Sequence, residues 1–111
     1  MSESSVRILH YESLESTNKT AAELCEWEHL DTVVADTQTL GRGRFGRAFY
    51  SGCGLYMSVI VDPLKIQAEI QNCTPAAALA VVDALESVGI DRLKIKWVND
   101  ILLDSKKICG I

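Results

Sequence analysis

The sequence predicts the α+β class: a mixed β-sheet with helices packed on it. Short runs rich in β-branched and aromatic residues, which are typical of strands, occur on both sides of one clear amphipathic helix. Strands, a helix and further strands in this order give a mixed sheet with helices on it. The 111 residues, 48% hydrophobic and 23% charged, suit one globular domain at most.

Three strands are predicted in the first half of the chain. Residues 6–11, 32–37 and 55–61 have the composition of strands, and Asp62 followed by Pro63 ends the last of them. A short helix is expected between the first two strands, because three N-cap residues stand in a row at 16–18.

This helix is expected to run to about Trp27. Thr20 and Glu23 have the spacing of a capping box, which supports a helix start in this region.

The second half begins with the clearest helix, residues 74–88. Thr74 is its expected cap, Pro75 occupies the first helical position, and Gly89 is a natural C-terminal stop. The apolar stripe of this helix consists of Leu79, Val82 and Leu85.

Strands follow this helix. Residues 93–97 alternate in strand fashion, and 101–103 with 107–111 form an expected hairpin that turns at 104–106. The chain stops inside an apparent strand, so we expect the front part of a longer domain.

Composition excludes several classes of protein. Eleven basic and fifteen acidic residues give a net charge of −4, which argues against general nucleic-acid binding. The first residues resemble no secretory signal, and no apolar run approaches the roughly 20 residues that span a membrane. We therefore expect a cytoplasmic protein without a membrane partner. No metal bound directly by the protein is predicted, because the cysteines and histidines are scattered: Cys25, Cys53, Cys73, Cys109, His10 and His29.

Residues 41–47 form the most informative segment, Gly-Arg-Gly-Arg-Phe-Gly-Arg, with no acidic residue between Asp36 and Asp62. Glycine allows the backbone to approach a ligand closely, and arginine offers paired donors to phosphate or carboxylate oxygens. A compact anion such as a nucleotide triphosphate is the natural ligand. The glycines also match the dinucleotide-binding fingerprint, but that motif requires a helix directly after them. A strand is expected there, so we reject it.

Three further segments have similar polar character. Hydroxyl and amide groups at Ser16–Asn18 suit a polar ligand head, although plain helix capping also explains them. The amide of Gln38 can hydrogen-bond to a donor and an acceptor of a neutral ligand, although most lone glutamines are merely solvated. Strand alternation would place Lys96, Val98 and Asp100 on one face, and a surface salt bridge is the alternative explanation.

Taken together, these motifs resemble the biotin protein ligases. The matching segments are Ser-Thr-Asn, Gln-x-x-Gly-Arg-Gly-Arg-x-Gly-Arg, Gly-Leu-Tyr-Met-Ser and Lys-Trp-x-Asn-Asp-(x)6-Lys-x-x-Gly-Ile, and they extend over residues 11–111. The chain resembles the front half of that family's catalytic domain, whose fold is related to the core of class II aminoacyl-tRNA synthetases.

The resemblance implies a two-step ligase reaction. Biotin and ATP with Mg²⁺ would give biotinyl-5′-AMP, and a lysine of a carboxylase's biotin carboxyl carrier domain would then accept the biotin. A homodimer is left open, and no N-terminal DNA-binding domain is expected, because few residues precede the first strand.

The resemblance also assigns roles to individual residues. Arg44 and Lys107 would be catalytic, because a carboxylate attacking a phosphate needs cations beside it. Asp100 would lie near the nucleotide, and Gly110 would let the strand approach the bicyclic ring. The residues assigned to biotin or biotinyl-AMP are Ser16, Thr17, Asn18, Gln38, Gly41, Arg42, Gly43, Arg44, Arg47, Phe49, Asp100, Lys107 and Gly110.

Two positions depart from the family pattern, and two other functions stay open. Phe49 replaces the usual tryptophan and offers less area to a ligand, whereas Val98 replaces a proline that carries no chemistry. Lipoate or octanoate ligases share the fold and the acyl-adenylate chemistry. A non-catalytic biotin-binding protein is the alternative from a different class.

Overall fold

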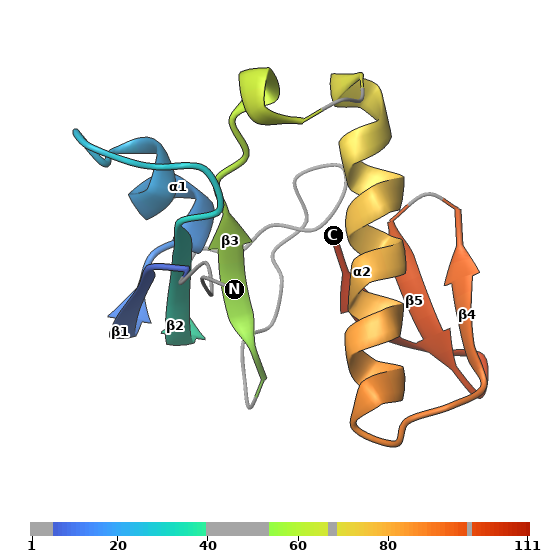
Figure 1. The fold of residues 1–111 in the computed structure, drawn as a ribbon. Coiled ribbons are helices and arrows are strands. Elements are labelled where there is room, and N and C mark those ends of the chain that lie inside the picture. The colour runs from blue at the N-terminus through green and yellow to red at the C-terminus, as the bar shows by residue number, and fades with distance from the viewer. Residues whose placement is uncertain (1–5, 40–53, 67–68, 98) are drawn as a thin grey trace. The chain divides into compact units, whose positions relative to one another are not determined.

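The computed structural model describes residues 6–39, 54–66, 69–97 and 99–111 (Figure 1). The arginine-rich segment 41–47 and Phe49 lie outside these ranges. Contacts divide the chain into two compact units, Met1–Ile66 and Gln67–Ile111, and each is described by itself.

The first unit contains a mixed three-stranded sheet. Its strands β1 (Ile8–Leu14), β2 (Thr32–Gln38) and β3 (Tyr56–Val59) lie in the order β1-β2-β3. The first pair is parallel and the second antiparallel. Helix α1 (Thr17–Ala22) connects the parallel strands and packs against β2 and β3 (Figure 1). The predicted strands are confirmed, with shifted ends.

Helix α1 is shorter than predicted. Ser16 is its N-cap, and the Ser16 hydroxyl accepts a hydrogen bond from the Lys19 backbone N–H at 3.3 Å. Glu23, expected at the start in a capping box with Thr20, is instead the C-cap residue. Both the capping box and the predicted end near Trp27 are therefore wrong.

The loop between α1 and β2 is held by the carboxylate of Asp31. This side chain accepts the Glu28 N–H at 2.9 Å and a guanidinium N–H of Arg7 at 2.6 Å. The Glu28 hydrogen bond, together with that from Arg7, lowers the pKa of Asp31 below its ordinary value. These hydrogen bonds hold the end of the loop just before β2.

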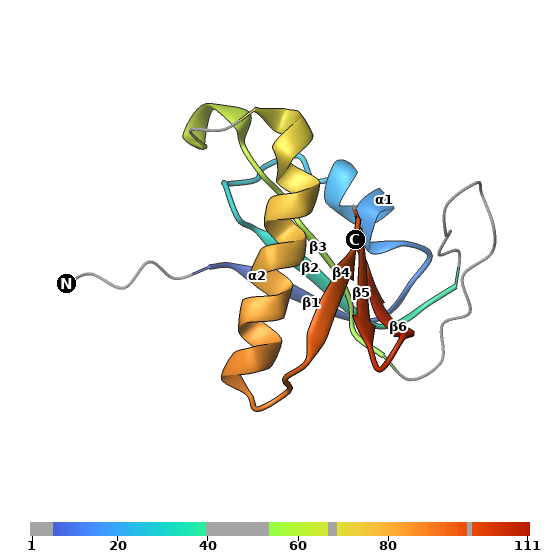
Figure 2. The same cartoon turned by 90° about the vertical axis from the view of Figure 1, so that its right-hand side faces the viewer.

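The second unit packs a helix along an antiparallel sheet. Helix α2 (Cys73–Ser87) runs beside β4 (Leu93–Lys96), β5 (Asp100–Leu103) and β6 (Lys106–Gly110), which lie in that order (Figure 2). Ile101 of β5 and Ala78 of α2 are fully buried. The α+β class is confirmed, and these strands form a second sheet. In the parts of the chain that the structure describes, no helix is long and apolar enough to cross a membrane.

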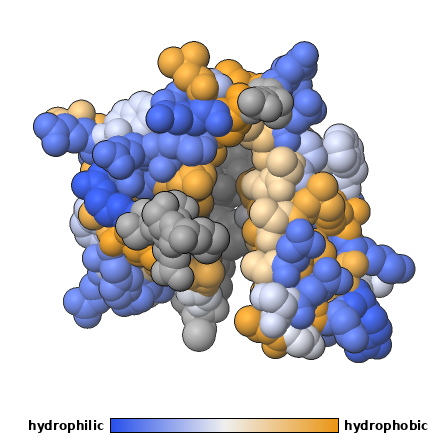
Figure 3. All heavy atoms as spheres, viewed as in Figure 1, coloured by the Kyte–Doolittle hydropathy of each residue, from blue (hydrophilic) through white to orange (hydrophobic). Residues whose placement is uncertain are grey.

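Helix α2 differs from its predicted form at the start and along its apolar face. A 3-10 turn, Ile70–Asn72, leads directly into it, so Thr74 lies inside the helix and does not cap it. Leu79, assigned to the buried stripe, is 59% exposed, whereas Ala78 is fully buried. Apolar side chains accordingly reach the surface over α2 (Figure 3). Gly89 has φ of +97°, as expected of a residue that ends a helix.

The strands of this unit match the predicted ones except at the turns. Trp97 and Asn99 lie in the turn between β4 and β5, so the predicted strand alternation through Asp100 is wrong. Asp104 and Ser105, with φ of 51° and 67°, make the turn between β5 and β6. Positive φ at both positions matches the twist of a tight hairpin.

Candidate functional site

The first polar cluster surrounds the start of α1. The backbone N–H of Thr17 donates to Oε1 of Gln38 at 2.8 Å, and the Thr17 hydroxyl lies 3.3 Å from the same oxygen. The parallel pairing of β1 with β2 explains this contact, because it brings Leu14, just before α1, opposite Gln38. Two segments predicted to bind one ligand therefore meet in the structure.

Ser58 of β3 joins the cluster from the next strand. Its hydroxyl lies 2.8 Å from the hydroxyl of Thr17 and donates to Oδ1 of Asn18. Thr17 is 4% exposed and Ser58 is 9% exposed, so these polar groups are largely removed from water. Buried polar groups require hydrogen-bond partners, and this network supplies them.

The described residues of this cluster offer hydroxyl and amide groups and include no charged side chain. Such groups recognise a neutral polar ligand that carries its own donors and acceptors. Ser16 also caps the helix, so the simpler explanation holds for its hydroxyl. Capping does not account for the contacts of Thr17 and Asn18 with two strands.

The second polar cluster lies on the hairpin of β5 and β6. The ammonium of Lys107 is 3.2 Å from Oδ1 of Asp100. The Asp100 side chain is 18% exposed, and Oδ1 is buried and receives no hydrogen bond from the described residues. The contact is therefore an ion pair that directs the ammonium by charge.

Gly110 leaves the space that the Lys107 side chain occupies. It pairs with Asp100 across the strands, and a Cβ at this position would lie 3.1 Å from Cε and 3.2 Å from Nζ of Lys107. Any larger residue would push the lysine aside. The sequence suggested a different reason for this glycine, close approach to a ligand ring, which stays a prediction.

An irregularity in β6 separates Lys107 from Gly110. Ile101 pairs with Cys109 and Leu102 pairs with Lys107, so Ile108 is an extra residue in β6. Such bulges bend a strand and redirect neighbouring side chains. Burial raises the pKa of the adjacent Cys109 thiol, which disfavours its thiolate form.

The structure thus forms two groups from the predicted residues. Thr17, Asn18 and Gln38 meet in the first unit, beside the capping residue Ser16, whereas Asp100, Lys107 and Gly110 meet in the second. The remaining predicted residues lie outside the described ranges: Gly41, Arg42, Gly43, Arg44, Arg47 and Phe49. Ser58 was missed, although it ends the Gly-Leu-Tyr-Met-Ser motif. It shares the inward face of β3 with Tyr56, two residues earlier.

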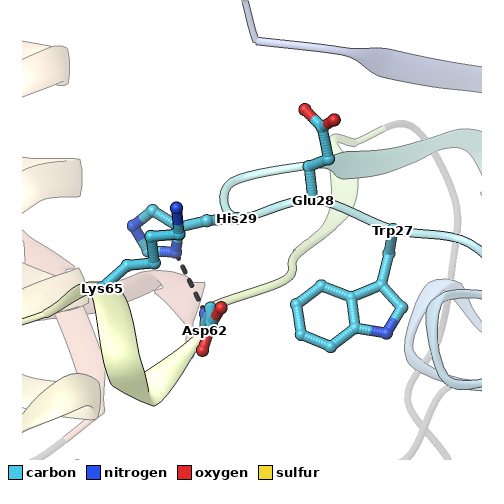
Figure 4. A pocket seen from close by; sticks show the side chains of 5 residues that line it. All are labelled: Trp27, Glu28, His29, Asp62 and Lys65. Atoms are coloured by element: carbon cyan, nitrogen blue, oxygen red, sulfur yellow. Dashed lines mark hydrogen bonds between the residues drawn. The ribbon is translucent and has the colours of Figure 1, made fainter.

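A surface hollow in the first unit is lined by a different set of residues. Trp27, Glu28, His29, Asp62 and Lys65 line a cavity of about 500 Å³ (Figure 4). Nδ1 of His29 accepts the Asp62 backbone N–H at 3.0 Å, which ties the α1–β2 loop to the segment after β3. Its lining combines both signs of charge in an open depression, so it does not define a ligand.

Together, the α+β fold, the buried hydroxyl and amide cluster and the ion-paired lysine are typical of a protein that binds a small polar ligand. The family model described as "Biotin/lipoate A/B protein ligase family" matches residues 11–111. The chain belongs to this family.

Curated relatives agree with this assignment. The bifunctional ligase/repressor BirA of Bacillus subtilis is 41% identical over 108 residues, which are 94% of this chain and 33% of that protein. The biotin–[acetyl-CoA-carboxylase] ligase of Paracoccus denitrificans is 38% identical over 82 residues, 71% of this chain and 34% of its own length. The chain spans about a third of these relatives.

Solved structures support the fold. A biotin protein ligase from Aquifex aeolicus, in complex with biotin and ATP, matches with a TM-score of 0.81 at 31% identity, over 94% of this chain and 44% of that chain. The ligase from Leishmania major, in complex with biotin, matches with a TM-score of 0.81 at 30% identity, over 94% of this chain and 49% of that chain. The predicted biotin ligase fold is therefore confirmed.

Proposed function

We propose that this chain activates biotin in a biotin protein ligase. The observation that carries the proposal is its similarity, over 94% of its length, to a biotin protein ligase solved with biotin and ATP. Biotin and ATP would form biotinyl-5′-AMP and pyrophosphate. Biotin would then pass to a lysine of a carboxylase's carrier domain.

In the first step, a carboxylate oxygen of biotin attacks the α-phosphorus of ATP. The bond between this phosphorus and the bridging oxygen breaks, and pyrophosphate leaves with the electron pair. Two anions approach each other, so fixed cations beside them lower the barrier. Mg²⁺ enters as part of the nucleotide substrate and neutralises phosphate charge.

Lys107 is the described residue best suited to supply such a cation. Its ammonium is directed by Asp100 at 3.2 Å, and Gly110 leaves room for its side chain. Arg44 would act with it at the developing charge. Arg42, Gly41, Gly43, Arg47 and Phe49 would enclose the carboxylate and phosphate.

The uncharged cluster at the start of α1 suits the head of biotin, a cyclic urea. Two ring N–H groups and a carbonyl oxygen need acceptors and donors in return. Thr17, Asn18 and Gln38 provide both kinds of group, with Ser16 beside them. The uncharged cluster thus suits the urea head in its chemistry, and a cation suits the carboxylate end.

In the second step, the amine of the carrier lysine attacks the carbonyl carbon of the mixed anhydride, and AMP leaves. We place this reaction in the cytoplasm. The relative from Bacillus subtilis is named both ligase and repressor, and the proposal covers the ligase reaction only. Because the family description includes lipoate ligases, lipoate is the competing substrate.

Exchange of labelled pyrophosphate into ATP tests the proposal directly. Two proteins are compared: this chain, and a chimera in which it replaces the matching region of the Bacillus subtilis relative. Biotin and lipoate serve as parallel substrates, and omission of both acids gives the background. We expect exchange with biotin and only background exchange with lipoate.

Each other outcome has a defined meaning. Exchange with lipoate alone would replace biotin by lipoate as the substrate. Background exchange in both proteins with both acids would overturn the proposal, provided that the relative itself shows exchange in the same assay.

A further inference from the structure

We infer that Ser58 is a positioning residue, which holds the Thr17 hydroxyl as a hydrogen-bond acceptor toward the ligand. This inference rests on the proposed function, since it concerns the head of the same substrate. Ser58 of β3 pairs with Val33 of the central strand β2 and is 9% exposed. Its hydroxyl contacts both Thr17 and Asn18, so it connects the first two residues of α1 to β3.

A count of protons gives the direction of the network. Each hydroxyl has one proton to donate and lone pairs that accept. In the amide orientation that the structure gives Asn18, Ser58 donates its proton to Oδ1 of Asn18. The Ser58 oxygen then accepts the proton of the Thr17 hydroxyl, 2.8 Å away. The Thr17 proton is then used inside the protein.

The opposite orientation of the Asn18 amide leads to the same result. In that arrangement the amide donates to Ser58, Ser58 donates to Thr17, and Thr17 donates to Oε1 of Gln38, 3.3 Å away. Again the only proton of the Thr17 hydroxyl stays within the network. In both orientations, Thr17 faces a ligand with lone pairs only.

This arrangement selects a ligand head that carries an N–H donor. The cyclic urea of biotin donates an N–H to such an oxygen, whereas the dithiolane ring of lipoate has no N–H to donate. Without Ser58, the Thr17 hydroxyl would keep only its 3.3 Å contact with Oε1 of Gln38 and would be held less firmly as an acceptor. The preference for an N–H group would then weaken, even though every residue assigned to touch biotin is still present.

The experiment compares Ser58→Ala with the unaltered protein. It uses the 111-residue chain or the chimera, according to which of them shows exchange with biotin. Michaelis constants in pyrophosphate exchange are measured for biotin, for ATP and for desthiobiotin, which keeps the cyclic urea and lacks the sulfur ring. We expect the KM for both ureas to rise about tenfold, equivalent to about 1.4 kcal/mol, the scale of one buried hydrogen bond. The KM for ATP should not change.

Two further variants make the comparison specific. Ser87→Ala makes the same substitution at an exposed serine of α2, whose hydroxyl donates to the nearby Ala84 carbonyl, and it should leave every constant unchanged. Ser58→Cys keeps a side chain of similar shape with a weaker donor and acceptor. Ser58→Cys should raise the KM for both ureas by an intermediate amount. It replaces Ser58→Ala in the experiment if that variant does not fold.

Two results would overturn the inference on Ser58 and leave the proposed function intact. One is an unchanged KM for biotin in both Ser58 variants. The other is an equal rise of the KM for biotin and ATP, as general damage to the fold would produce. Failure of the unaltered proteins to use biotin would instead overturn the proposed function, and this inference with it.

Discussion

Lys107 stands out among the described basic residues, because several features of the hairpin act on its side chain. Asp100 attracts the ammonium of Lys107, and Gly110 leaves room for the Lys107 side chain. The extra residue Ile108 shifts the strand register beside it. Lys106 precedes it and is exposed, with none of these features. Adjacent lysines therefore differ sharply in what the fold requires of them.

We predict that Lys107→Ala lowers the rate of biotinyl-adenylate formation about 100-fold, the usual scale for one fixed charge contact at a reacting centre. Arg44→Ala should have an effect of similar size. Pyrophosphate exchange at saturating biotin and ATP measures the rate. Lys106→Ala is the matched control and should be nearly silent, and normal exchange in Lys107→Ala would contradict the assignment.

At this scale the sequence predicted the cluster of Thr17, Asn18 and Gln38, and the structure brings them together. Ser58 was missed because its place at the end of the Gly-Leu-Tyr-Met-Ser motif does not show which side chains it contacts. Its partners lie 40 and 41 positions away in the chain, on α1, and the packing of α1 against β3 brings them to Ser58. Gly110 was predicted, but its contact with Lys107 depends on side-chain geometry that no pattern encodes.

At the scale of elements, composition predicted the strands and α2, but it did not predict where α1 ends or where α2 begins. Cap signals are short and local, and the region of α1 contains two of them: the row Ser16–Asn18 and the pair Thr20 and Glu23. Ser16 and not Thr20 begins α1, because the backbone of Thr17 also bonds Gln38. The 3-10 turn ahead of α2 moved its start to Cys73. At α1 a tertiary hydrogen bond thus distinguishes between caps of similar propensity, whereas at α2 a local turn sets the start.

The α1–β2 loop gives a prediction that depends on pH. Hydrogen bonds from Glu28 and Arg7 lower the pKa of Asp31, so its charged form stabilises the fold. This stability is present above the unfolded value of about 3.9 and is lost as the pH falls through the lower folded value. Asp31→Asn should therefore lower the melting temperature by several degrees at pH 7, and the difference should vanish at the acid end.

Thermal melts of both proteins from pH 7 to pH 2 test this expectation. Asp83→Asn, at an exposed position of α2, is the matched control and should follow the unaltered chain throughout. A difference between Asp31→Asn and the unaltered chain that stays constant down to pH 2 would show that charge at Asp31 is not its cause.

At the scale of the whole molecule, the described core is small. Its buried apolar residues are Val33 and Ala35 in the first unit and Ala78 and Ile101 in the second. Short units bury a small fraction of their surface and are marginally stable. The curated relatives contain about three times the length of this chain, which gives them more surface to bury.

Core size bears on catalysis, because the reaction needs its groups held in place. A misplacement of about 1 Å can cost about 100-fold in rate, and a marginal core holds Thr17 and Lys107 less firmly. We therefore predict that the 111-residue chain exchanges pyrophosphate about 100-fold more slowly than the chimera with the Bacillus subtilis relative. Both proteins are assayed at the same biotin and ATP concentrations, and their melting temperatures are compared. Equal rates would show that these residues alone fix the reacting groups, and a lower melting temperature for the chain would then have no catalytic consequence.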